Sequence, residues 1–316
     1  MLLSARYWVY FLPLLSLTGF SEAKEAPPKI ADGVILQQDL FNHGMKEGVT
    51  CYRIPALVTA PNGDLIAAMD ERGGDGGDLG DNKDINIVVR RSADAGATWS
   101  AIETVFDGPY GVAASDPSMI TDRNTGALFL FYNYMDHNTA PGVYRLYVIK
   151  SMDNGISWGK PEEITSQITS PEWQKDFKFI TSGNGTQTRS GVLLNTLVNL
   201  QRGLYVFGSN DDGKSWFRID KALTPGDESR VVELADGAWM INSRIKGGGM
   251  RYVHTTRDQG KAWQSRPEPA LIDPACNAGL VRYTCTTDGY DKNRLLFSNI
   301  KTIRERRNLA VRISYD

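Results

Sequence analysis

The chain has 316 residues, of which 41% are hydrophobic and 23% charged, with a formal net charge of -2. This is an ordinary soluble composition with enough apolar residues for a sizeable core. Because no basic block or basic helix face occurs, nucleic acid is excluded as an expected partner. A pI near 6.0 gives no reason to expect docking on an anionic membrane surface.

The first 23 residues are predicted to be a signal peptide. Arg6 precedes an apolar run over residues 7–20, and Ser21-Glu22-Ala23 places small residues at the two positions that a signal peptidase reads. The run is too short for a stable membrane span. We therefore expect an exported protein that is secreted, periplasmic or held at the cell surface. The alternative is an uncleaved N-terminal anchor.

A strand-turn-strand unit follows in the mature chain. Arg53, within Tyr-Arg-Ile-Pro, heads a predicted strand over residues 56–59, a turn falls at Pro61-Asn62-Gly63, and a second strand covers residues 65–69. An acid-rich loop then leads to a third strand at residues 85–90. Taken alone, this unit is a hairpin with charged residues at its rim.

A short motif recurs along the chain with the pattern S/T-x-D-x-G-x-S/T-W. It occupies residues 92–99, 151–158 and 209–216, and a fourth copy at 256–263 has Ala262 in place of the second hydroxyl residue. The pattern is typical of a hairpin turn, in which Asp accepts hydrogen bonds from the turn backbone and Gly supplies a positive φ. We expect these boxes to be structural and to face away from any functional site.

Short alternating strands are predicted between the boxes, and no long apolar segment with helical period occurs. The predicted strands cover residues 127–131, 144–149, 203–207, 230–234, 238–241 and 295–298. Strands that repeat with a period near 50 residues indicate a β-propeller with about four strands to a blade. Ser314 and Asp316 stand where a further box should begin, so we expect the sequence to stop inside a repeat and the propeller to lack its last blade.

The three cysteines, Cys51, Cys276 and Cys285, cannot all be paired within the chain because their number is odd. Cys276 and Cys285 are close enough in sequence to bridge a small loop in an oxidising compartment. Cys51 is expected to be a buried thiol rather than a nucleophile.

From residue 37 to residue 316 the chain resembles the bacterial exo-α-sialidases (neuraminidases). The resemblance rests on Arg-Ile-Pro, on the four Asp boxes, and on Asp-Glu-Ser-x-Val-Val-Glu-Leu at residues 227–234. It implies an all-β fold, a six-bladed β-propeller, here incomplete at the C-terminus. Residues 24–316 would then be the catalytic domain. The site would lie on the propeller axis, at the opposite end from the boxes.

The resemblance implies a cradle of three arginines for the carboxylate of sialic acid, and guanidinium suits a planar carboxylate well. Motif matching assigns Arg53, Arg244 and Arg306 to the cradle. Arg304 and Arg307 remain alternatives to Arg306. Further contacts to the sugar ring are assigned to Arg72 and Asp116.

The resemblance also implies an aspartate as general acid and base, on the loop after Arg72. Counting back from the strand at 85–92 favours Asp81, with Asp78 as the alternative. Glu228 matches the glutamate that activates a tyrosine nucleophile, a residue type that avoids the repulsion a carboxylate would meet. That tyrosine would follow residue 316. Neither a metal nor a cofactor is expected.

The implied function is hydrolysis of terminal α-linked sialic acid from sialylated glycans, with retention through a tyrosyl intermediate, by a monomeric enzyme. A trans-sialidase or an intramolecular, anhydro-forming sialidase would use the same residues. An alternative from another functional class is a non-catalytic Asp-box propeller that binds glycans. The placement of Arg53, Arg244, Arg306 and Glu228 at matching offsets favours the enzyme.

Overall fold

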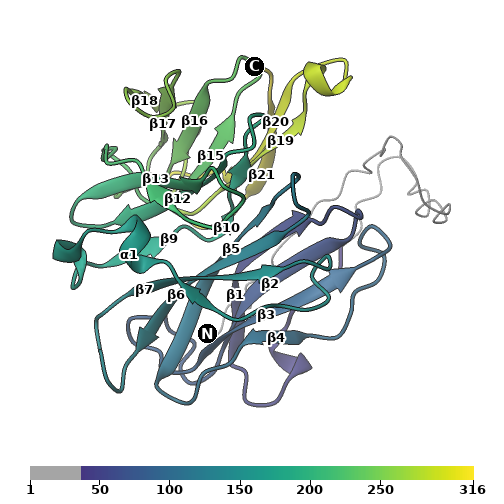
Figure 1. Cartoon of the computed structure of the whole chain (residues 1–316), viewed down its shortest axis with the longest axis vertical. Helices are drawn as coiled ribbons and strands as arrows, with labels where there is room; N and C mark the ends of the chain where they lie inside the picture. The colour runs from purple at the N-terminus through teal and green to yellow at the C-terminus, as the bar shows by residue number, and fades with distance from the viewer. Residues whose placement is uncertain (1–36) are drawn as a thin grey trace.

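Residues 37–316 are described by a computed structural model, and they form five β-sheets that follow one another along the chain. The predicted signal peptide lies outside the described residues. In Figure 1 the colour passes from the purple and blue strands of the first two sheets, in the lower half, to the green and yellow strands of the later sheets in the upper half. The all-β propeller architecture is confirmed. The described residues supply five sheets, whereas the fold implied by the resemblance has six blades.

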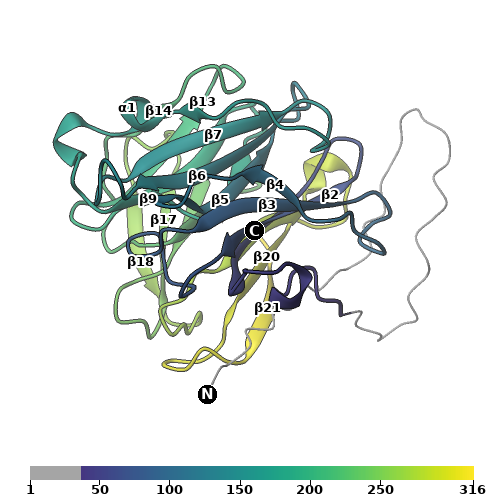
Figure 2. The same cartoon turned by 90° about the horizontal axis from the view of Figure 1, so that it is seen from below.

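Sheets 1 and 2 are built largely from consecutive antiparallel strands. Sheet 1 has the order β1 (Cys51–Thr59), β2 (Leu65–Arg72), β3 (Ile85–Ser92) and β4 (Glu103–Phe106). Sheet 2 has the order β10 (Gly183–Asn184), β5 (Val112–Thr121), β6 (Leu128–Asp136), β7 (Arg145–Ser151) and β8 (Glu162–Glu163). Figure 2 shows β5, β6 and β7 side by side. The short strand β10 joins β5 in parallel, so a later part of the chain completes the inner edge of sheet 2.

The remaining three sheets repeat the pattern. Sheet 3 contains β9 (Lys178–Ile180), β11 (Thr186–Gln187), β12 (Leu193–Asn199), β13 (Gly203–Ser209) and β14 (Phe217–Arg218). Sheet 4 contains β15 (Ser229–Glu233), β16 (Trp239–Ser243), β17 (Arg251–Thr256) and β18 (Gln264–Glu268). Sheet 5 contains β19 (Gly279–Thr284), β20 (Arg294–Ile300) and β21 (Leu309–Ser314).

Helical structure is minor in the described residues. It comprises α1 (Thr165–Ile168) and three single 3-10 turns at His43–Met45, Pro171–Trp173 and Thr286–Asp288. None of the helices within residues 37–316 has the length and hydrophobicity needed to cross a membrane.

The hydrophobic core lies between successive sheets. Phe131 of sheet 2 contacts Phe207 and Trp216 of sheet 3 edge-on, with ring centroids 5.6 and 4.9 Å apart. Similar buried clusters join sheets 1 and 2, sheets 3 and 4, and sheets 4 and 5. The inner strands of the central sheets are buried on both faces, as in β12, where every residue is buried. In sheet 5, by contrast, burial alternates along β20, and β21 has no buried residue.

The four boxes form the predicted turns. In the box at residues 151–158, Ser151 Oγ donates to Asp153 Oδ1 (2.8 Å), and the Gly155 N–H donates to Ser151 Oγ (2.9 Å). Gly155 has the expected positive φ of 78°, but so does the preceding Asn154, at 60°. The same pair of left-handed residues occurs in the other three boxes. The sequence pattern missed the first of each pair, because a non-glycine residue disfavours this conformation in isolation.

The strand register separates the boxes from the site predicted at Arg53. Ser92, which opens the first box, pairs with Leu65 at one end of β2, whereas Arg72 at the other end pairs with Ile85. The predicted strands all exist. The structure extends β1 and β2 toward the end that carries Arg72, whereas it extends β3 and β7 toward the boxes. Arg53 itself lies inside β1 rather than ahead of it.

Candidate active site

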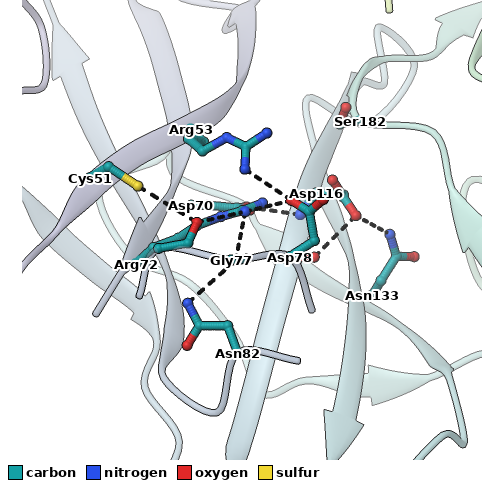
Figure 3. Close-up of polar contacts among 12 residues, drawn as sticks. Cys51, Arg53, Asp70, Arg72, Gly77, Asp78, Asn82, Asp116, Asn133 and Ser182 are labelled. Atoms are coloured by element: carbon teal, nitrogen blue, oxygen red, sulfur yellow. Dashed lines mark hydrogen bonds and ion pairs between the residues drawn. The ribbon is translucent and has the colours of Figure 1, made fainter. Parts of the chain in front are cut away.

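Arg53, Arg72 and Asp78 meet at one end of sheet 1, where Figure 3 shows their side chains pointing toward one another. Asp78 Oδ1 accepts from Arg53 Nη1 at 3.1 Å and from Arg72 Nη1 at 2.6 Å. A bulge between Arg53 and Ala56 interrupts the pairing of β1 with β2, and Ile54 within it has a φ of 61°. Bulges of this kind redirect a side chain, and here the redirected residue is Arg53.

Arg72 is almost fully buried, and two sets of contacts fix its guanidinium. Asp70 Oδ2 accepts from its Nε at 3.1 Å and from its Nη2 at 2.8 Å, while the Gly77 carbonyl accepts from Nη1 at 2.7 Å. The acid-rich loop is therefore tied to Arg72 through its backbone as well as through Asp78. Asn82 adds to this order, since its side-chain amide donates to the carbonyls of Gly73 and Gly77.

The two aspartates considered for acid and base catalysis occupy different surroundings. The side chain of Asp78 is 75% exposed, yet desolvation is still the largest single influence on its pKa and acts to raise it. Hydrogen bonding and charge from Arg72, with charge from Arg53 and Arg306, hold the pKa of Asp78 below its usual value. Asp81 is exposed and lies near Tyr144, whose pKa is raised first by burial and then by the charge of Asp81. The structure thus brings Asp78 into contact with the arginines, and not Asp81.

Asp116 comes from sheet 2 and faces this cluster. It lies in a bulge of β5 between Ser115 and Ser118 and has a left-handed φ of 62°. Its Oδ2 accepts from Ser115 Oγ at 3.0 Å and from Asn133 Nδ2 at 3.1 Å. Burial raises the pKa of Asp116, the hydrogen bond from Asn133 opposes that rise, and the nearby charge of Glu228 adds to it.

Glu228 and Arg244 flank the same end of sheet 4. Ser229 pairs with Ser243 in the register of β15 and β16, so the next residue outward on each strand brings Glu228 opposite Arg244. The Arg244 N–H donates to the Glu228 carbonyl at 2.9 Å, and the two side chains form an ion pair. Burial lowers the pKa of Arg244, but the charge and hydrogen bond of Glu228 outweigh it and raise the pKa.

Arg306 lies on the exposed connection between β20 and β21 of sheet 5. It is close enough for its charge to lower the pKa of Asp78 and to oppose the burial that raises the pKa of Cys276. The charges of Arg244 and Glu228 also act on the pKa of Cys276, so this thiol lies near their ion pair. In sequence it lies between β18 of sheet 4 and β19 of sheet 5. Of the two alternatives to Arg306, Arg307 forms an ion pair with Glu305 at 2.5 Å.

The three cysteines of the described residues are free, so the possible bridge between Cys276 and Cys285 is not formed. Cys51 is half-buried rather than buried, and its Sγ faces the Gly76 carbonyl at 3.9 Å. Cys51 adjoins the Arg53 motif in sequence, whereas nothing in the sequence indicated that Cys276 would lie beside the predicted site.

Chemically, the arrangement combines guanidinium groups from sheets 1, 4 and 5 with carboxylates from sheets 1, 2 and 4. Such a ring can hold a planar anion, and the carboxylates can transfer protons next to it. Asp70 and Asn133 were not predicted. Asp70 could have been found, because it stands two residues before Arg72 on one strand and therefore shares its face. Nothing in the sequence around Asn133 singles it out.

Comparison with known proteins assigns the chain to a protein family. The profile of the BNR repeat-like domain matches residues 63–316. This protein belongs to the BNR repeat-like family. The expected relation to the sialidases with Asp-box repeats is confirmed.

Among the relatives of this BNR repeat-like protein, a sialidase of Micromonospora viridifaciens is 32% identical over 92% of this chain and 48% of its own length. A sialidase of Bacteroides fragilis (strain YCH46) is 30% identical over 87% of this chain and 54% of its own length. The BNR repeat-like chain thus spans about half the length of these two curated relatives.

Two solved structures resemble the fold closely. A Hadza microbial sialidase, Hz136, superposes with a TM-score of 0.77 at 30% identity, over 85% of this chain and 57% of that one. A leech intramolecular trans-sialidase, in complex with 2,7-anhydro-Neu5Ac, also gives 0.77, over 90% of this chain and 60% of that one. At 19% identity the second likeness shows that the BNR repeat-like chain shares the fold, and no more.

Proposed function

We propose that this protein is an exo-α-sialidase that hydrolyses terminal α-linked sialic acid from glycoproteins, glycolipids or oligosaccharides. The observation that carries the proposal is the convergence of Arg53, Arg244 and Arg306, from three different sheets, on the same end of the propeller. Sialic acid bears its carboxylate on the anomeric carbon, so a fixed cationic cradle also positions the bond to be cleaved. The names of the relatives, which are sialidases, support the same substrate class.

In this proposal Asp78 is the general acid and base, in preference to Asp81. Free Asp78 is ionised and paired with Arg53 and Arg72. A sialic acid carboxylate bound to the arginines offsets their positive charge, which raises the pKa of Asp78 and lets it protonate the leaving oxygen. The ionised form left behind can then activate water.

The retaining mechanism through a tyrosine is also part of the proposal. Glu228 would take the proton of the tyrosine, and a neutral phenol approaches the substrate carboxylate without the repulsion that a carboxylate nucleophile would meet. Export by the N-terminal segment and action as a monomer belong to the proposal as well.

Turnover of a fluorogenic aryl sialoside by the whole protein tests the proposal. Arg53→Ala is expected to remove most of the activity, because it removes one arm of the cradle. The matched control is Arg91→Ala, which deletes a half-exposed arginine paired with Asp64 at 2.6 Å, at the box end of the same sheet. An Arg53→Ala protein with normal turnover would refute the cradle.

The second candidate is an intramolecular trans-sialidase, because the same arginines and carboxylates would serve that reaction, and the leech enzyme is an example of this fold with that activity. The two activities differ in product. Release of free sialic acid supports the hydrolase, whereas release of an anhydro sugar supports the alternative. Binding of a sialoside without any product would instead support a non-catalytic glycan-binding propeller.

A further inference from the structure

We infer that Asp70 is a positioning residue, which acts by holding Arg72 of sheet 1 and the backbone of Asp116 of sheet 2 in fixed relation to each other. The inference rests on the proposed function and deepens it, since both held residues belong to the proposed sialic acid site. Asp70 itself faces no open part of the site: it is 0% exposed.

The two oxygens of Asp70 are divided between the two blades. Oδ2 receives the Nε and Nη2 donors of Arg72, at 3.1 and 2.8 Å. Oδ1 receives the backbone N–H of Asp116 at 2.8 Å. Figure 3 shows Asp70 lying between Arg72 and the strand that carries Asp116. One carboxylate thus sets the spacing of two residues that are 44 positions apart in sequence (116−72).

The hydrogen bond from the Asp116 N–H to Asp70 stabilises a strained backbone conformation at Asp116. Asp116 is a non-glycine residue with a φ of 62°, and Pro117 follows it directly. A left-handed residue in a bulge persists only where its surroundings enforce it. The buried hydrogen bond from the Asp116 N–H to Asp70 is such an enforcement, and it determines where the Asp116 side chain points.

Asn133 completes the support from the opposite side. Its Nδ2 donates to Asp116 Oδ2 at 3.1 Å, and its Oδ1 accepts from the Ile180 N–H of β9 at 2.8 Å. The chain of contacts therefore runs from sheet 1 through sheet 2 into sheet 3. Networks of this kind are rigid when every member is satisfied, so loss of the central carboxylate is expected to loosen both neighbours.

The number of hydrogen-bond donors around residue 70 explains why an aspartate fits this position and an asparagine would not. Arg72 presents only donors, and the Asp116 N–H is a further donor, so the residue between them must accept on both oxygens. An amide has one accepting oxygen and turns its NH2 toward one of the two partners. Asp70→Asn must therefore break either the Arg72 contact or the Asp116 contact.

The test measures binding of N-acetylneuraminic acid and turnover of a fluorogenic sialoside by the wild-type protein, by Asp70→Asn and by a matched control. The control is Asp122→Asn, which removes the charge of an equally buried aspartate that accepts from Gln187 at 2.6 Å. Asp122 follows the same strand β5, about 20 Å from Asp116 at the box end.

We expect Asp70→Asn to weaken binding of N-acetylneuraminic acid by about tenfold or more, with a matching rise in KM. Asp122→Asn is expected to stay within about twofold of wild type in both, although both variants melt at lower temperature. Equal binding by Asp70→Asn and wild type would overturn the inference. So would equal weakening by the two variants, since that outcome indicates general loosening.

Should Asp70→Asn not fold, Asp70→Glu is the second variant. It keeps the charge beside Arg72, but its longer side chain cannot meet both partners at the same distances. Binding weakened by about threefold or more supports the inference, and unchanged binding overturns it. If the wild-type protein neither binds nor cleaves the sialosides, the proposed function is wrong, and the inference that rests on it is wrong as well.

Discussion

At the scale of single residues, the proposed chemistry depends on the position of Asp78. Its carboxylate bridges Arg53 and Arg72, and their charges hold its pKa low despite partial desolvation. The same carboxylate must be neutral to protonate a leaving group. Occupation of the arginines by a substrate carboxylate is the simplest way to switch one state to the other.

The assignment of Asp78 predicts a difference between two neighbouring variants. Asp78→Asn is expected to lower kcat for sialyllactose by about 10²- to 10⁴-fold, the usual contribution of a general acid. The loss should be smaller for an aryl sialoside, whose leaving group needs less protonation. Asp81→Asn, the matched control on the same loop, should stay close to wild type in steady-state kinetics. A larger loss for Asp81→Asn would return the role to Asp81.

The pH dependence of the reaction has a predictable sign. Protonated Asp78 is lost as the pH rises through its pKa, which is lowered in the free protein and, in the proposed mechanism, raised in the complex with substrate. Because kcat/KM reports the free protein and kcat reports the complex, the alkaline limb of kcat should lie at the higher pH. Rate profiles with sialyllactose measure both limbs. Coincident limbs would contradict charge neutralisation by the substrate.

At the scale of elements, the Asp box is a self-contained turn. The first hydroxyl of the box accepts a hydrogen bond from the Gly N–H. The Asp accepts from both the side chain and the backbone of the second hydroxyl residue. In the box at residues 151–158, for example, Asp153 accepts from Ser157 Oγ at 2.5 Å and from the Ser157 N–H at 2.9 Å. These donors lower the pKa of Asp153 to about 2. The fourth box lacks the second hydroxyl, so only the Ala262 N–H reaches Asp258 from that residue, at 2.9 Å.

The boxes predict opposite effects for two substitutions. Ser151→Ala leaves the buried Gly155 N–H without its acceptor and should destabilise the fold by about 1–3 kcal/mol. Ala262→Ser restores the missing hydroxyl, and should be neutral or stabilise by up to about 1 kcal/mol. Urea unfolding measures both. Turnover of a sialoside should be unchanged in each, and a loss of activity without a loss of stability would contradict the structural role.

At the scale of the whole molecule, the site exists only because several sheets meet. Sheet 1 supplies Arg53, Arg72 and Asp78, while sheets 2, 4 and 5 supply Asp116, the Glu228–Arg244 pair and Arg306. A ligand that contacts all of these residues connects sheets that are not direct neighbours in the propeller. Binding should therefore stabilise the folded state.

The expected size of that stabilisation follows from mass action. N-acetylneuraminic acid at one hundred times its Kd should raise the free energy of unfolding by about 2.7 kcal/mol. Thermal melting with and without the sugar measures the effect. In Arg53→Ala the stabilisation at the same concentration should be largely lost. An equal shift in both proteins would place the sugar elsewhere than in the arginine cradle.

Prediction from sequence succeeded where a local rule applies. The Asp-box turns and the hairpin after Arg53 follow from turn chemistry and from the alternation of short adjacent strands. The acid on the loop after Arg72 was harder, because a glycine-rich loop has no period from which to count. There the hydrogen bonds of Arg72 and Asn82 decide which aspartate faces the arginines.

The sequence by itself determined that the chain is an all-β propeller with repeated turns, and it marked most of the charged residues that gather at one end. Those features depend on residue type and spacing along a single strand or turn. Only the tertiary structure decided that Asp78 lies between Arg53 and Arg72, and that Asp70 joins Arg72 to Asp116. These contacts cross loops and blades, and their energies depend on burial and orientation, which no local pattern encodes.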